Sequence, residues 1–146
     1  MSKSLNIRVF KHKILIDALT ESELHSLTKD FRYYKETGQK PEFFGRDEAY
    51  DHLNTLPILK SEEVKHIHLA ATDAPSLSSI QFYQTSDKHL VYCQGWNEPS
   101  CFLLIAILAP DAHEQARNRT IMHNLGLIAE KFSKIGVNHR PMRAVI

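Results

Sequence analysis

The sequence has little that would set it apart from ordinary globular proteins. Its 146 residues include two cysteines, Cys93 and Cys101, so a disulfide framework is not expected. The longest apolar run, residues 102–109, is 8 residues long, whereas a transmembrane helix needs about 20. The N-terminus is basic but lacks the apolar core of a signal peptide. We therefore expect a single reduced domain over residues 1–146, located in the cytoplasm and without a membrane segment.

Net charge is also scarce, at +1. Residues 1–109 carry 12 basic and 14 acidic side chains, whereas residues 110–146 carry 6 and 3. The C-terminal segment is therefore weakly basic and could face phosphate. A protein that binds duplex nucleic acid tightly by itself would normally be far more basic.

Hydrophobic periodicity predicts a compact α+β domain with the order β-α-α-β-β-β-α. We expect an antiparallel sheet with its helices on one face. The long loop over residues 71–87 and an extension over about 134–146 show no clear pattern. Strands are predicted at 6–10 (with an optional continuation through 13–16), 63–69, 88–94 and 101–108, and helices at about 20–37, 47–53 and 111–135.

Six blocks of sequence carry a family resemblance over about residues 7–133. They are Ile7 to Lys11; Phe44 to Asp47 with Tyr50 and Asp51; Val64 to Leu69; His89 to Gly95; Leu103 to Leu108 with Pro110, His113, Ala116 and Arg117; and Met122 and His123 with Gly126. Their order and spacing resemble those of the YafO family of bacterial toxins. The segment around 76–86 and the C-terminal extension are not covered.

The resemblance implies a toxin of a type II toxin–antitoxin system. Such a toxin would cleave mRNA in association with the ribosome and would be neutralised by an antitoxin protein. More distantly, the order of elements resembles RelE-like toxins, which cut RNA on a curved sheet without a metal or other cofactor. The oligomeric state is left open, with a homodimer as one alternative.

Metal-free cleavage of RNA uses the 2′-hydroxyl of the substrate as nucleophile. It needs a base for that proton, an acid for the departing 5′ oxygen and cations for the charge on the phosphate. Histidine can be acid or base near neutral pH, and arginine can bind phosphate. Histidines and arginines that would share a surface are therefore the candidates for the catalytic site.

His66 and His68 are two positions apart, so in a strand they share a face. The aliphatic residues between and after them would point into the core, which leaves both imidazoles on an open face. The same alternation in the next strand predicts Val91 in the core and Tyr92 and Gln94 on the open face. We thus expect His66 and His68 to be catalytic and Tyr92 and Gln94 to bind substrate, although a merely solvated sheet face would look the same.

The final predicted helix supplies further candidates at i, i+4 spacing. His113 and Arg117 would share one side of its first turns, where the helix dipole favours a neutral imidazole that could act as a base. Both are predicted to be catalytic. Arg119 and His123 form a second such pair, and we expect these two, with Arg46 in the Phe44–Asp47 block, to bind RNA. The alternative for Arg46 is a structural role or binding of the antitoxin, and the alternative for Arg117 is an ion pair with Glu114 or Asp111.

Two other functions are compatible with the same residues. His66 and His68 could ligate a metal ion, with a third ligand from His113 or Asp111, but the sequence shows no complete set of ligands. The chain could also be a non-catalytic module that binds the ribosome or another protein.

The low net charge yields a first prediction. Purified protein should degrade naked RNA poorly, because a net charge of only +1 gives little affinity from the release of counterions on the phosphates. The measurement is the decay of a free RNA substrate in the absence of ribosomes. Rapid digestion of that RNA would contradict the prediction.

Overall fold

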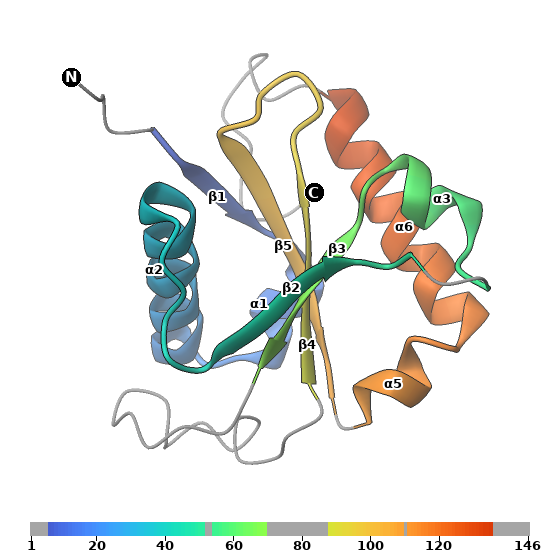
Figure 1. The fold of residues 1–146 in the computed structure, drawn as a ribbon, viewed down its shortest axis with the longest axis horizontal. Coiled ribbons are helices and arrows are strands. Elements are labelled where there is room, and N and C mark those ends of the chain that lie inside the picture. The colour runs from blue at the N-terminus through green and yellow to red at the C-terminus, as the bar shows by residue number, and fades with distance from the viewer. Residues whose placement is uncertain (1–5, 52–53, 70–87, 110, 136–146) are drawn as a thin grey trace.

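The computed structural model describes residues 6–51, 54–69, 88–109 and 111–135. Its strands are β1 (Arg8–Lys11), β2 (Phe44–Ala49), β3 (Lys65–Leu69), β4 (Lys88–Gln94) and β5 (Cys101–Leu108). They form one sheet in the order β1-β5-β4-β3-β2 (Figure 1). All neighbours are antiparallel except β1 and β5, which are parallel.

Helices cover both faces of this sheet (Figure 1). They are α1 (Lys13–Ala18), α2 (Glu21–Thr37), α3 (Pro57–Ser61), α5 (Ala112–Gln115) and α6 (Arg119–Ile135). The first two lie on one face and the other three on the opposite face. Each face therefore buries its own hydrophobic core.

Strand β4 shows how the two cores are divided. Leu90 and Tyr92 point into the core under α1 and α2, whereas Val91 and Cys93 point into the core under α3 and α6. Strand β5 lies beside it in the middle of the sheet and is buried along nearly its whole length. This explains why β5 is apolar at every position rather than alternating.

Much of the expected α+β domain is confirmed. The sheet is mainly antiparallel, and strands occupy the predicted segments near 63–69, 88–94 and 101–108. Helix α2 begins after Thr20, close to the predicted start, and the hydroxyl of Thr20 and the side chain of Glu23 form a capping box. It ends at Gly38, which has a φ of 79° and supplies the left-handed turn.

The expectation that all helices cover one face is wrong. Leu15 and Leu27 from the first two helices enter one core, and Leu59 and Phe132 from later helices enter the other. The optional strand over 13–16 is also wrong, because these residues form α1. The side chain of His12 accepts a hydrogen bond from the backbone of Ile14 and caps that helix.

Two predicted helices differ as well. Residues from Asp47 onward do not open a helix, because pairing with β3 extends this segment into β2. The long helix from residue 111 is two helices with a break at Ala116 to Asn118. The side chain of Asn118 accepts a hydrogen bond from the backbone N–H of Ile121, which caps the start of α6. The loop over 71–87 and the C-terminal extension lie outside the described residues.

A bulge in β2 determines which of its side chains face each core. Phe44 pairs with Leu69 and Asp47 with Ile67, so β2 contains one more residue than β3 in this interval. A Cβ atom at Gly45 would lie 3.2 Å from the carbonyl oxygen of His68, and glycine avoids this close contact. As a result Phe44 and Asp47 both face the α2 side.

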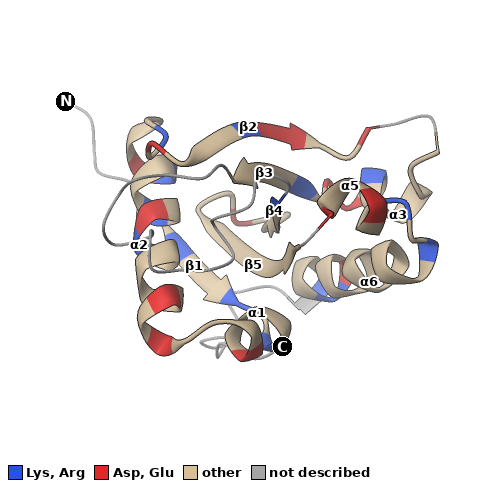
Figure 2. Ribbon diagram, turned by 90° about the horizontal axis from the view of Figure 1, so that it is seen from below, with Lys and Arg blue, Asp and Glu red and all other residues tan. Residues whose placement is uncertain are grey.

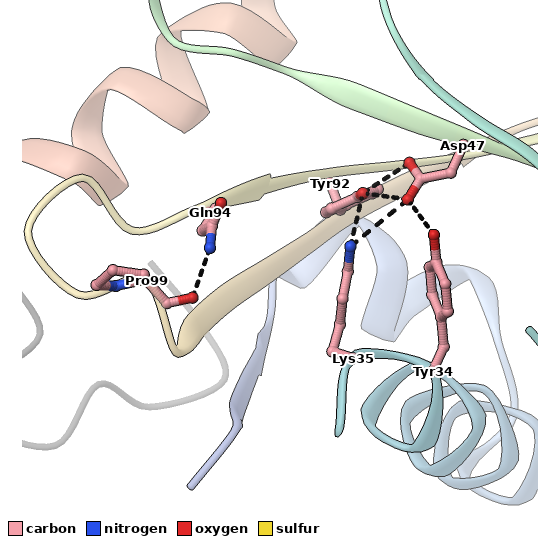
Figure 3. Close-up of polar contacts among 6 residues, drawn as sticks. All are labelled: Tyr34, Lys35, Asp47, Tyr92, Gln94 and Pro99. Atoms are coloured by element: carbon pink, nitrogen blue, oxygen red, sulfur yellow. Dashed lines mark hydrogen bonds and ion pairs between the residues drawn. The ribbon is translucent and has the colours of Figure 1, made fainter. Parts of the chain in front are cut away.

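Asp47 links β2 to the rest of this face through hydrogen bonds (Figure 3). The hydroxyl of Tyr34 donates to it at 2.6 Å and that of Tyr92 at 2.7 Å, while the ammonium of Lys35 lies 3.5 Å away. Burial raises the pKa of Asp47, but these hydrogen bonds and the charges of Lys35 and Lys65 outweigh it and lower the net pKa. Asp47 is therefore ionised and holds β2 against α2 and β4.

This network predicts that Tyr92→Phe lowers the free energy of unfolding by about 1–3 kcal/mol, because a largely buried carboxylate loses a donor. Tyr33→Phe is the matched control. Its hydroxyl donates to Gln39 on an exposed site, so the loss should be below about 0.5 kcal/mol. Urea unfolding of both variants measures the difference. Equal effects would contradict a structural role for Tyr92.

Candidate active site

The antiparallel register of β3 and β4 gathers three histidines on one face of the sheet. His68 lies directly opposite His89, and His66 is opposite Val91. Their ring centroids are separated by 4.3 Å for His66 and His89, 4.6 Å for His68 and His89, and 4.9 Å for His66 and His68. We call these three residues the histidine cluster.

Tyr50, just beyond the end of β2, covers the inner part of the histidine cluster. Its ring stacks on that of His66 at a centroid distance of 4.0 Å, and its hydroxyl lies 3.0 Å from Nδ1 of His89. His66 and His89 are only 7% and 3% exposed. These two imidazoles are therefore held in place beneath the surface.

The outer edge of the cluster is reached from solvent. The side chain of His68 is 21% exposed, and its Nε2 lies 3.4 Å from the carboxylate of Glu48. Glu48 also lies 3.4 Å from the guanidinium of Arg46 on the same face of β2. His113 on α5 is exposed, with its ring 6.3 Å from that of His68 and 5.5 Å from that of His89. His68, Arg46 and His113 thus surround one site.

Burial controls the protonation of the inner histidine. It lowers the pKa of His66 to about 4, and the neighbouring His68 adds to this effect. Burial also lowers the pKa of His68, helped by Arg46, while Glu48 opposes the shift. Both rings are neutral at pH 7. They can accept a proton, donate a hydrogen bond or offer a lone pair to a metal ion.

The model of the family described as "Toxin YafO, type II toxin-antitoxin system" matches residues 32–134, which include all the residues of this site. The chain belongs to the YafO family. It is 48% identical over 128 residues to the mRNA interferase toxin YafO of Escherichia coli (strain K12), and this match covers 86% of the chain and 97% of the relative. No solved structure matches the chain. None of the described helices is long and apolar enough to cross a membrane.

Membership of the YafO family confirms the resemblance drawn from the six sequence blocks. The likeness to RelE-like toxins stays a prediction. So do the catalytic and substrate-binding roles, but the structure shows which of the proposed residues lie together. His66, His68 and His113 do so. The alternation of β3 is confirmed, but the expectation that His66 lies on an open face is wrong, because this residue is buried beneath Tyr50.

The placement of Tyr92 and Gln94 on the same surface as the histidines is wrong. Tyr92 is 1% exposed, lies on the opposite face of the sheet and donates its hydroxyl to Asp47. Gln94 is exposed near the end of β4, where its amide donates to the carbonyl of Pro99 at 2.6 Å (Figure 3). Alternation was assigned correctly within each strand, but the two strands were placed in the wrong phase relative to each other.

The predicted arginines lie in different surroundings. Arg46 is beside His68 and Glu48, whereas Arg117 is exposed and lies 3.2 Å from Glu114, one of the two alternative partners expected for it. Arg117 lies beyond α5, so it and His113 are not on one continuous helix. Arg119 and His123 are exposed on α6. Acidic and basic residues are both scattered over the described elements, and on β2 the basic Arg46 is followed by the acidic Asp47 and Glu48 (Figure 2).

Three residues of the site in this YafO-family chain were missed by sequence reasoning. His89 and Tyr50 lie in two of the six blocks that carry the family resemblance, but neither was assigned to the site. Alternation with Val91 places His89 on its face of β4, and the pairing of β3 with β4 then brings it to His68. Glu48 and Tyr50 follow from β2, which was predicted to be a helix. The signal for all three is the correct pairing of strands.

The alternation of β3 predicts that substitutions at neighbouring residues lower the free energy of unfolding by very different amounts. Ile67→Ala should lower the free energy of unfolding by about 2–5 kcal/mol, because Ile67 is fully buried in the core under α2. His68→Ala should cost about 1 kcal/mol or less, since it removes a partly exposed pair with Glu48. Chemical denaturation measures both values. A larger loss for His68→Ala than for Ile67→Ala would contradict the assigned faces.

Proposed function

We propose that this chain is the toxin of a type II toxin–antitoxin system that cleaves mRNA on the ribosome in the cytoplasm and so inhibits translation. An antitoxin protein would bind and neutralise it. Membership of the YafO family and the 48% identical relative, which is named an mRNA interferase toxin, support this proposal. The single observation that carries it is the grouping of four imidazoles next to Arg46 at a partly exposed site.

The proposed reaction needs only groups that the RNA and these residues supply. The 2′ oxygen forms a bond to phosphorus while a base takes its proton. The bond from phosphorus to the 5′ oxygen breaks, and an acid gives that oxygen a proton. The products are a 2′,3′-cyclic phosphate and a 5′-hydroxyl, so this step uses no metal or cofactor.

His68 and His113 are the members of the site best placed to touch RNA. Both are reached from solvent, and their ring separation of 6.3 Å lets them address different oxygens of one phosphate. We assign them the acid and base roles, with the order of the two roles left open. His66 and His89 lie behind them and act as positioning residues that support the ring of His68.

Cations are needed where charge grows on the phosphate oxygens. Arg46 is the best-placed arginine for this role, because it lies close enough for its charge to lower the pKa of both His66 and His68. Release of Arg46 from its exposed pair with Glu48 costs little. Arg117 is a second candidate if it leaves Glu114. Arg119 and His123 on α6 would contact RNA or the ribosome further out.

The proposal predicts that His68→Ala or His113→Ala lowers the rate of ribosome-dependent mRNA cleavage by about 10²–10⁴-fold, because the reaction loses an acid or base. Growth arrest on expression should be relieved. The control is His25→Ala, an exposed histidine on α2 on the other side of the sheet. Primer extension on a reporter mRNA measures cleavage, and circular dichroism checks folding.

Two outcomes would contradict the proposal. Folded His68→Ala and His113→Ala proteins that cleave like the unsubstituted chain would remove the histidines from the reaction. Growth arrest without any cleavage products would favour a non-catalytic module that occupies the ribosome.

A further inference from the structure

The histidine cluster brings three metal-binding side chains together on two neighbouring strands. One ring nitrogen from each of His66, His68 and His89 can be chosen so that the three atoms all lie within 4.8 Å of one another. Nδ1 of His66 is buried and meets no hydrogen-bond partner among the described residues. We propose that His66, His68 and His89 bind one divalent transition-metal ion, Zn²⁺ above all, and that the bound ion inhibits the toxin.

The ligand chemistry favours zinc over magnesium or calcium. Imidazole is a common ligand of zinc, whereas magnesium and calcium prefer oxygen ligands. With Zn–N bonds of about 2.0–2.1 Å, tetrahedral coordination brings ligand nitrogens to roughly 3.3 Å from each other. Rotation of the partly exposed His68 ring would bring its nitrogen closer to those of His66 and His89. The side chain of His68 is 21% exposed, so of the three ligands it lies nearest to solvent.

The surroundings of the cluster suit a bound cation. A histidine that ligates zinc through one nitrogen usually donates a hydrogen bond from the other. Tyr50 provides such an acceptor, because its hydroxyl lies 3.0 Å from Nδ1 of His89. The Nδ1–H of His89 would donate to this oxygen and leave Nε2 for the metal. The carboxylate of Glu48, 3.4 Å from His68, supplies compensating negative charge.

The outer histidine gives the site its regulatory consequence. A metal ion would take the nitrogen lone pair that His68 needs for proton transfer. The fourth position would face α5, where the ring of His113 is 5.5 Å from that of His89. Inhibition rests on the proposed function, whereas binding itself does not.

Metal binding is tested on the full chain without an affinity tag, after removal of metals with a chelator. Titration with Co²⁺ should give a visible absorption spectrum that saturates at one ion per chain, and Zn²⁺ should displace it. His89→Gln and His66→Gln should abolish stoichiometric binding, whereas His25→Gln should leave it unchanged. Tyr50→Phe should weaken binding by about 10–100-fold. Thermal unfolding in the absence of metal confirms that each variant is folded.

A second measurement separates the two parts of the inference. Zn²⁺ should raise the melting temperature of the metal-free chain and slow its cleavage of ribosome-bound mRNA, with cleavage restored by chelation and constant magnesium. Binding that does not saturate at one ion, or that survives His89→Gln, would overturn the site. Saturable binding without slower cleavage would overturn the inhibition. Cleavage that requires Zn²⁺ would overturn both the inhibition and the metal-free reaction, while leaving the site in place.

Discussion

The register between β3 and β4 is the constraint on which the candidate site depends. It sets His68 against His89 and leaves His66 within ring contact of both. The same register sends Ile67 and Leu69 into the core on the other face. A slip of one residue would bury the wrong side chains and disperse the imidazoles. The energy of the hydrophobic core therefore maintains the position of the polar site.

Strand β2 completes the site from the outside, and its bulge gives it two roles. Asp47 turns toward α2 and joins the buried network with Tyr92, while Arg46 and Glu48 turn toward His68. The glycine at the bulge permits the close approach to β3. Consecutive residues of β2 thus point to opposite faces of the sheet. Asp47 anchors the strand on one face, and Arg46 and Glu48 form the charged rim of the site on the other.

Sequence reasoning succeeded where the signal was local. The helix over about 20–37, the apolar β5 and the alternation of β3 all follow from neighbouring residues, and the alternation of β3 led to His66 and His68. It failed where distant pairing decides the structure. The long segment between β3 and β4 leaves their relative phase undetermined, so Tyr92 was placed on the wrong face and His89 was missed. Similarly, only pairing with β3 makes β2 a strand, and without it Tyr50 and Glu48 could not be assigned to the site.

The central claim is that imidazoles transfer protons while the RNA 2′-hydroxyl attacks the phosphate. The chemical ends of the cleavage products test it most directly. Mass spectrometry of mRNA fragments from a ribosome-bound reaction should show a 2′,3′-cyclic phosphate, or the monophosphate formed on its opening, and a 5′-hydroxyl on the adjoining fragment. A 3′-hydroxyl with a 5′-phosphate would mean that water attacks the phosphate, and it would contradict the account.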